Sequence, residues 1–121
     1  MNTLILEKRT TESLLYDIDC TPNLAVTEII STISAPTADQ GGLTFGTPIV
    51  NTVTANYPDG TSAAPGKAIQ VRIIGGAIPA GSTIPDGRPG IACTVRATYL
   101  TTPQGNTREA TVVLWLTNTP A

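Results

Sequence analysis

Asp17 and Asp19 are the pair of groups in this sequence whose types and spacing could do chemistry together. Carboxylates two residues apart on a β-strand point to the same side of it, roughly 7 Å from each other. Such a pair could bind a hard cation such as calcium, or act as the acid and base of glycoside hydrolysis. Calcium needs six or more oxygen ligands, however, and hydrolysis needs a cleft lined by aromatic side chains. We therefore expect two solvated carboxylates, with a metal site and catalysis as the alternatives.

The rest of the chain offers little further chemistry. It contains no histidine, which removes the commonest general base and every Ser-His or Cys-His dyad. Cys20 and Cys93 fall on expected inward strand faces, and reduced core cysteines are favoured over a disulfide because no export signal precedes them. The Asp-Gly pairs at 59–60 and 86–87 are explained by turns. No catalytic residue, metal ligand or cofactor is predicted, and we expect a protein that is not an enzyme.

Composition and charge exclude other classes of function. The formal net charge of the 121 residues is −2, and the 7 basic residues are scattered, whereas phosphate binding needs a basic stripe. We therefore expect no nucleic-acid partner. The apolar runs are too short to span a bilayer, and the N-terminus lacks the basic start and long apolar core of a signal peptide. We expect a protein made in the cytoplasm, with no membrane partner.

Short strands must position the groups named above. Charged residues make up only 13% of the chain, and 11 glycines and 10 prolines punctuate it, a mixture that favours short strands over helices. Strands are expected at 3–7, 13–20, 24–33, two pieces of 43–57 divided by Pro48, 67–74, and the arms of a terminal hairpin at 91–101 and 107–117. Seven to eight such strands predict a single Ig-like antiparallel β-sandwich over residues 1–121. Residues 1–12 form an N-terminal arm or edge strand in this interpretation, and 118–121 a short tail.

The last strand carries apolar residues on both faces. Ala110, Val112, Leu114 and Leu116 form one face. Val113 and Trp115 lie on the other face. Apolar side chains are not expected there if that face of the sheet is exposed to water. Either a neighbouring segment such as Leu4 to Leu6 covers them, or another protein does. The Pro- and Gly-rich residues 77–90 form a loop long enough to touch a partner. The predicted interface therefore consists of Val113, Trp115, Leu4, Leu6, Ile78, Ile84 and Arg88.

Four short segments carry a resemblance to a known family. They are Leu4-Ile-Leu-Glu-Lys-Arg9, Leu15-Tyr-Asp-Ile-Asp19, Gly75-Gly76 and Gly-Asn-Thr-Arg-Glu at 105–109. Their order resembles a family of small tailed-phage proteins described as fiber-tail adaptors, or related Ig-like virion modules. The resemblance implies no activity and no cofactor. It implies a protein that works by shape and links one oligomeric virion component to another.

The leading hypothesis is a non-enzymatic structural protein of a phage virion, an adaptor joining tail and fiber components. It would be synthesised in the host bacterial cytoplasm and would be multimeric in the particle, with other tail, fiber or capsid proteins as partners. One alternative is a capsid decoration protein. Another is a carbohydrate-binding or adhesion module, for which only Trp115 and Tyr57 could supply an exposed aromatic platform. A hydrolase using Asp17 and Asp19 is the third.

Overall fold

The computed structural model describes residues 5–120 and confirms the all-β prediction. The strands are β1 (Ile5–Lys8), β2 (Ser13–Asp19), β3 (Ile29–Ile33), β4 (Thr37–Ala38), β5 (Thr44–Phe45), β6 (Ile49–Val50), β7 (Ala55–Asn56), β8 (Ser62–Ala63), β9 (Ala68–Ile74), β10 (Ile91–Thr102) and β11 (Thr107–Leu116), with one 3-10 turn, η1 (Thr21–Asn23). The prediction of seven to eight strands undercounts the two-residue pieces β4 to β8. The described part of the chain has no helix long and apolar enough to cross a membrane.

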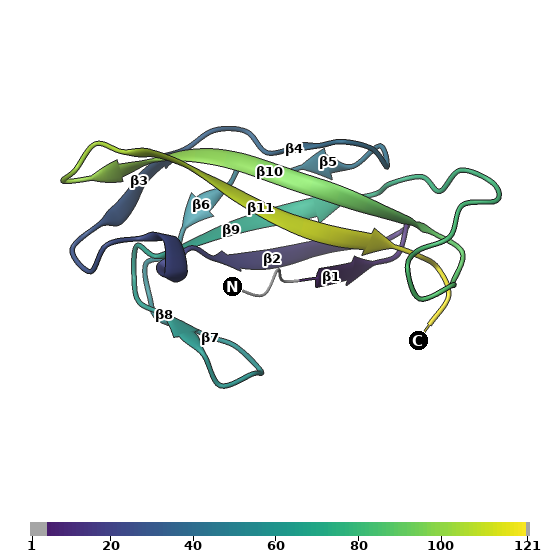
Figure 1. Ribbon diagram of the computed structural model, residues 1–121, viewed down its shortest axis with the longest axis horizontal. Coiled ribbons are helices and arrows are strands. Elements are labelled where there is room, and N and C mark those ends of the chain that lie inside the picture. The colour runs from purple at the N-terminus through teal and green to yellow at the C-terminus, as the bar shows by residue number, and fades with distance from the viewer. Residues whose placement is uncertain (1–4, 121) are drawn as a thin grey trace.

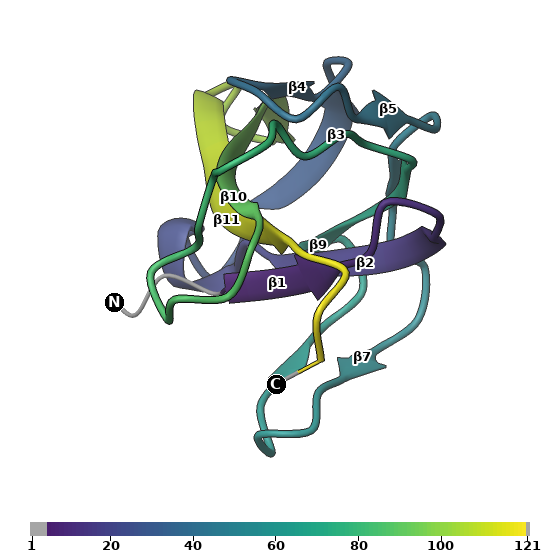
Figure 2. The ribbon, with the colours of Figure 1, turned by 90° about the vertical axis from the view of Figure 1, so that its right-hand side faces the viewer.

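Two sheets pack face to face as a β-sandwich, seen from the side in Figure 1 and from one end in Figure 2. One sheet has the order β1-β11-β10-β3, with β4 also paired to β10, and the other has the order β2-β9-β5, with β6 also paired to β9. β7 and β8 form a small separate hairpin. The pairs are antiparallel except that β1 runs parallel to β11, which differs from the all-antiparallel prediction. No hairpin fixes the direction of β1, because the chain passes from it into β2 of the other sheet.

The core lies between the sheets, where alternation along each strand predicted it. Ala110, Val112, Leu114 and Leu116 of β11 are buried, as are Ile69, Val71 and Ile73 of β9. Cys20 and Cys93 are buried in this core as free thiols, as predicted, and burial raises the pKa of each to about 11. The long hairpin of β10 and β11 is confirmed, with bounds within a residue of those expected.

Two predicted strands are shorter than expected. The segment expected over 24–33 becomes a strand only at Ile29, because a buried glutamate and a buried lysine hold the preceding residues as a loop. Pro48 divides β5 from β6 as predicted, but the alternation does not run through it. Val50 packs against the core, whereas Ile49 is 54% exposed.

Gly75 and Gly76 follow the end of β9, and their surroundings differ. A Cβ on Gly76, at φ +125°, would lie 2.7 Å from Leu116 Cδ2, whereas a Cβ on Gly75, at φ +67°, would meet nothing within 4 Å. We expect Gly76→Ala to lower the free energy of unfolding by about 2–4 kcal/mol, from strain and overpacking together. Gly75→Ala carries the backbone strain alone and should cost about 1 kcal/mol. Urea denaturation measures both, and equal losses would mean that the Leu116 contact is unimportant.

Candidate functional site

The interface predicted from the last strand is only partly available on the surface. Val113 and Trp115 are half-buried. Leu6 pairs with Leu114 and packs against the core, so it neither covers Trp115 nor offers itself to a partner. Ile5 and Glu7 stand opposite Val113 and Trp115 in the parallel register instead. Leu4 lies outside the described residues.

The predicted contact loop, residues 77–90, is closed over the end of the sandwich. Ile84, expected to face a partner, is instead buried at 2% exposure, and Ile78 packs against the core. Arg88 forms ion pairs with Glu7 and Asp86. Because loop residues fold back on the protein, the residues predicted as an interface do not gather into one open surface.

Of the two aspartates named at the outset, Asp19 serves local structure. Asp19 Oδ1 accepts a hydrogen bond from the Thr21 N–H at 2.9 Å. Turn chemistry is confirmed at Asp59, whose Oδ1 accepts from the Thr61 N–H at 3.0 Å, and at Asp86, whose Oδ1 accepts from the Arg88 N–H at 3.1 Å. Within residues 5–120, no three His, Cys, Asp or Glu side chains are grouped so that they could hold a metal ion.

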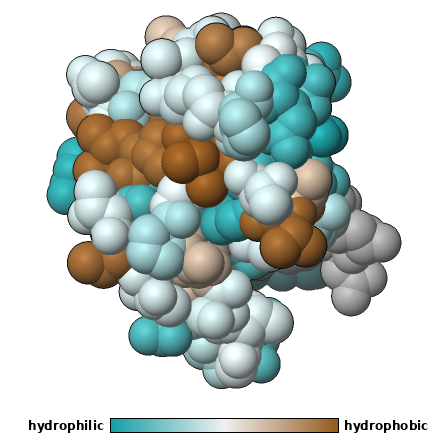
Figure 3. Space-filling model, turned by 90° about the vertical axis from the view of Figure 1, so that its left-hand side faces the viewer, coloured by the Kyte–Doolittle hydropathy of each residue, from teal (hydrophilic) through white to brown (hydrophobic). Residues whose placement is uncertain are grey.

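Three exposed aliphatic side chains stand at the end of the sandwich that carries the β7–β8 hairpin. Val26 is 96% exposed, Val53 70% and Ile29 43%. We call these three residues the apolar end. Figure 3 faces this end of the molecule and shows hydrophobic surface gathered on it. Single exposed aliphatic residues are ordinary, but several together at one end of a small domain are typical of a contact surface.

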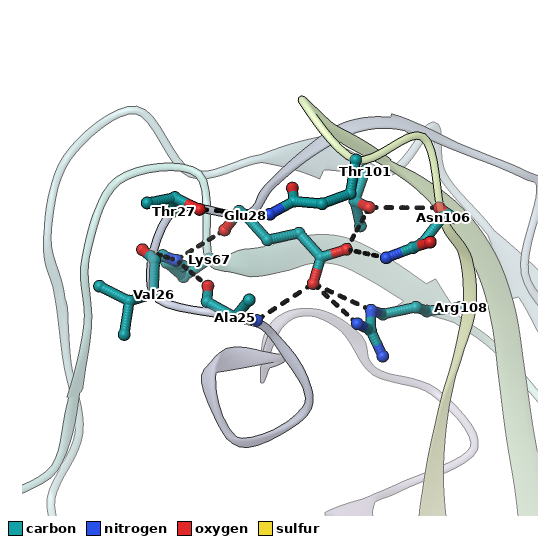
Figure 4. Close-up of polar contacts among 9 residues, drawn as sticks. Ala25, Val26, Thr27, Glu28, Lys67, Thr101, Asn106 and Arg108 are labelled. Atoms are coloured by element: carbon teal, nitrogen blue, oxygen red, sulfur yellow. Dashed lines mark hydrogen bonds and ion pairs between the residues drawn. The ribbon is translucent and has the colours of Figure 1, made fainter.

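A buried lysine fixes the loop that presents Val26 (Figure 4). Lys67 is only 9% exposed, and its Nζ donates to the carbonyl oxygens of Ala25, Val26 and Glu28 at 3.1, 2.9 and 2.6 Å. A lysine ammonium has three protons to donate, and all three are used here. Val26, the most exposed large aliphatic residue among residues 5–120, therefore lies on a backbone that the buried Lys67 holds in place.

Glu28 holds the same loop from the other side. Its side chain is fully buried. Oε1 accepts from the Ala25 N–H at 3.1 Å and from Arg108 Nη2 at 2.9 Å, while Oε2 accepts from Thr101 Oγ1 at 2.5 Å and Asn106 Nδ2 at 2.9 Å. The bonds from Thr101 and Arg108 are the main reason that the pKa of Glu28 falls to about 2. The carboxylate thus ties the loop to both arms of the terminal hairpin.

Asn51 connects the other two residues of the apolar end. Its Nδ2 donates to the Val53 carbonyl oxygen at 2.9 Å, and its Oδ1 accepts from the N–H groups of Lys67 and Ala68 at 3.1 and 2.9 Å. Beside it, a Cβ on Gly66 would lie 3.0 Å from Ile29 Cβ. All three members of the apolar end therefore flank one buried polar network.

This arrangement can hold an apolar surface in one shape before a partner arrives. A loop that is already ordered loses little conformational entropy on binding, so the same contact area gives a higher affinity. Sequence reasoning missed the site because it assigned 24–33 to one strand. The signal available was Glu28 within an otherwise apolar run, since a buried charge must be paired.

No family model matches the sequence, and neither a curated protein nor a solved structure is found to be similar to it.

Proposed function

We propose that this protein is a non-enzymatic structural component of a tailed-phage particle, an adaptor that joins tail and fiber subunits by docking. The observation that carries the docking role is the apolar end, three exposed aliphatic residues beside the buried network of Lys67, Glu28 and Asn51. The family resemblance of the sequence supports the particle as its place. Many copies in an assembly would make a small contact of this kind sufficient, because linked contacts bind far more tightly than single ones.

Particles test the proposal directly. Mass spectrometry of purified virions of the phage whose genome carries this coding sequence should detect the chain in a fixed ratio to the tail proteins. A constant ratio to the capsid protein alone would favour the alternative of a capsid decoration protein. Consistent absence of the chain from washed particles would end both versions.

The apolar end itself is tested by a matched pair of surface variants. We expect Val26→Ser to reduce incorporation into particles about tenfold, since a central apolar contact contributes a kcal/mol or more to binding. Its stability should hardly change, because the side chain is 96% exposed. Leu15→Ser is the control, since Leu15 is 56% exposed on the outer face of the β2 sheet. If both variants incorporate like the native chain, the apolar end is not the docking surface.

A further inference from the structure

One side of the sandwich is only half closed. β1 pairs with β11 from Val113 to Leu116, and the Tyr16 hydroxyl donates to the Glu7 carbonyl oxygen, so β1 bridges the two sheets there. Beyond Ile5 the described chain leaves β11 without a neighbour on that side, and β2 is the edge of the other sheet. Figure 1 shows β2 and β11 on this side of the molecule, with β1 beside them and the β7–β8 hairpin below.

A groove of about 500 Å³ lies in this opening. Ile18, Ala110 and Val112 supply apolar surface, and η1 and the β7–β8 hairpin supply its far wall. Aspartates from two separate segments stand along it: Asp17 and Asp19 on β2, and Asp59 in the hairpin turn. No lysine or arginine lines the groove among the described residues. Its polar character is therefore acidic, over an apolar base.

Two of these carboxylates, those of Asp19 and Asp59, are held in place by hydrogen bonds. Asp59 accepts from the Thr61 hydroxyl at 2.6 Å and from its N–H at 3.0 Å, and these two bonds lower the pKa of Asp59. Asp19 accepts from the Thr21 N–H. A fixed negative charge beside an apolar surface favours a cation on a long aliphatic stem, because such a side chain can satisfy both parts.

The hydroxyl of Tyr57, which lines the groove, is buried and has no hydrogen-bond partner within the described chain. Tyr99 lies behind the groove in the core, where it is 2% exposed. Burial, followed by the charges of Asp19 and Asp17, raises the pKa of Tyr57 to about 12. Both phenols lie next to Cys20, another lining residue. A hydroxyl that is buried without a hydrogen-bond partner destabilises the protein. This end of the groove can therefore form a hydrogen bond with a polar group of a bound molecule.

The part of β11 that has no neighbour on this side among residues 5–120 is suited to accept another strand. Edge strands are usually protected by charged residues, proline or a bulge. Ala110-Thr111-Val112, which lines the groove, has neither charge nor proline, and its pairing with β10 is regular. An extended segment can add to such an edge through backbone hydrogen bonds. β1 already does so along the other half of the same edge.

We propose that the groove binds an extended segment of a partner protein, which adds a strand to β11 at Ala110–Val112 and places a lysine or arginine side chain among Asp17, Asp19 and Asp59. The free edge, its continuity with the β1 pairing and the complementary charge all select this occupant. The inference rests on the proposed function only in taking the occupant to be a protein. Its site is separate from the apolar end, so the two can fail independently.

Two fluorescein-labelled peptides test it on the full chain, acetyl-Thr-Val-Thr-Arg-Thr-Val-Thr-amide and the same peptide with glutamate in place of arginine. Fluorescence anisotropy should show the arginine peptide binding about tenfold more tightly, or better, as complementary charge requires. Asp17→Asn with Asp19→Asn should remove most of this preference. Glu12→Gln with Glu109→Gln changes the net charge equally outside the groove and should preserve it. Equal binding of the two peptides, or no binding of either, overturns the proposal.

Hydrogen exchange separates strand addition from mere charge attraction. On binding the arginine peptide, exchange should slow at the backbone amides of residues 110–112 and stay unchanged at Leu15 on the outer sheet face. Unchanged exchange at 110–112 overturns the proposal even if the peptide binds. A peptide that binds only a chain shortened by residues 1–4 would identify the chain's own N-terminus as the occupant, which also overturns it. In either case, the incorporation of Val26→Ser into particles would still test the proposed function, because the apolar end is a separate site.

Discussion

Replacing Glu28 with glutamine should lower the melting temperature by roughly 10 °C or more, the largest loss expected of any polar substitution here. Four donors converge on this carboxylate, from Ala25, Thr101, Asn106 and Arg108. An ionised carboxylate accepts at both oxygens, whereas the glutamine amide must turn an NH₂ group toward donors. The substitution therefore leaves buried donors unpaired and removes the counter-charge of Arg108.

Glu109→Gln is the matched control for this change. Glu109 is an exposed residue of β11, and its carboxylate accepts from the Thr111 hydroxyl of the same strand. We expect a change of no more than about 2 °C, in keeping with an exposed interaction. Thermal unfolding followed by circular dichroism measures both variants. Similar small losses for the two would contradict the role given to Glu28.

The pH dependence of the free energy of unfolding is a second test of the stabilising role of the Glu28 carboxylate. The pKa of Glu28 is about 2 in the folded protein, against an ordinary value of 4.5. A lowered pKa in the folded state stabilises the protein above the ordinary value, and this contribution is lost as the pH falls from about 5 toward 2. Asp59 and Asp86 also have lowered pKa values, so the Glu28→Gln variant should show a shallower acid transition and not a flat one.

The sheets could be predicted from sequence because alternation is a local signal. In β10 and in β9 from Ile69 onward, buried residues alternate with less buried ones, and β11 shows the same alternation from Ala110 onward. The parallel pairing of β1 has no such signal, because its partner β11 lies at the other end of the chain. The alternation likewise gives no warning that, just after Pro48, Val50 packs against the core while Ile49 is exposed.

The candidate site could not be predicted because it is made of long-range polar contacts. Glu28 meets Thr101 and Arg108, which are 73 and 80 positions away, and Lys67 meets the Val26 carbonyl 41 positions away. The sequence around Glu28 or Lys67 does not indicate which distant residues these side chains contact. The aspartates show the reverse: Asp17 and Asp19 lie on β2 as predicted, but the groove that they line is completed by a distant hairpin turn.

Lys67→Met should lower the free energy of unfolding by about 2–4 kcal/mol, because three carbonyl groups lose a buried charged donor while the aliphatic stem is kept. Hydrogen exchange should also accelerate at residues 25–28 well below the denaturation midpoint. Arg72→Met is the control. Arg72 is an exposed cation on β9, the strand that follows Lys67, and its Nη1 donates to one carbonyl, that of Ser13, at 3.0 Å. It should cost less than about 1 kcal/mol.

The Lys67 variant also distinguishes a fixed apolar end from one that is merely exposed. Lys67→Met leaves Val26, Ile29 and Val53 in the sequence and removes only the contact that holds the Val26 backbone. If preorganisation matters, incorporation into particles should fall with Lys67→Met as it does with Val26→Ser, at a temperature where both variants are folded. Normal incorporation of a folded Lys67→Met protein would mean that the partner orders the loop itself. The buried lysine would then serve stability alone.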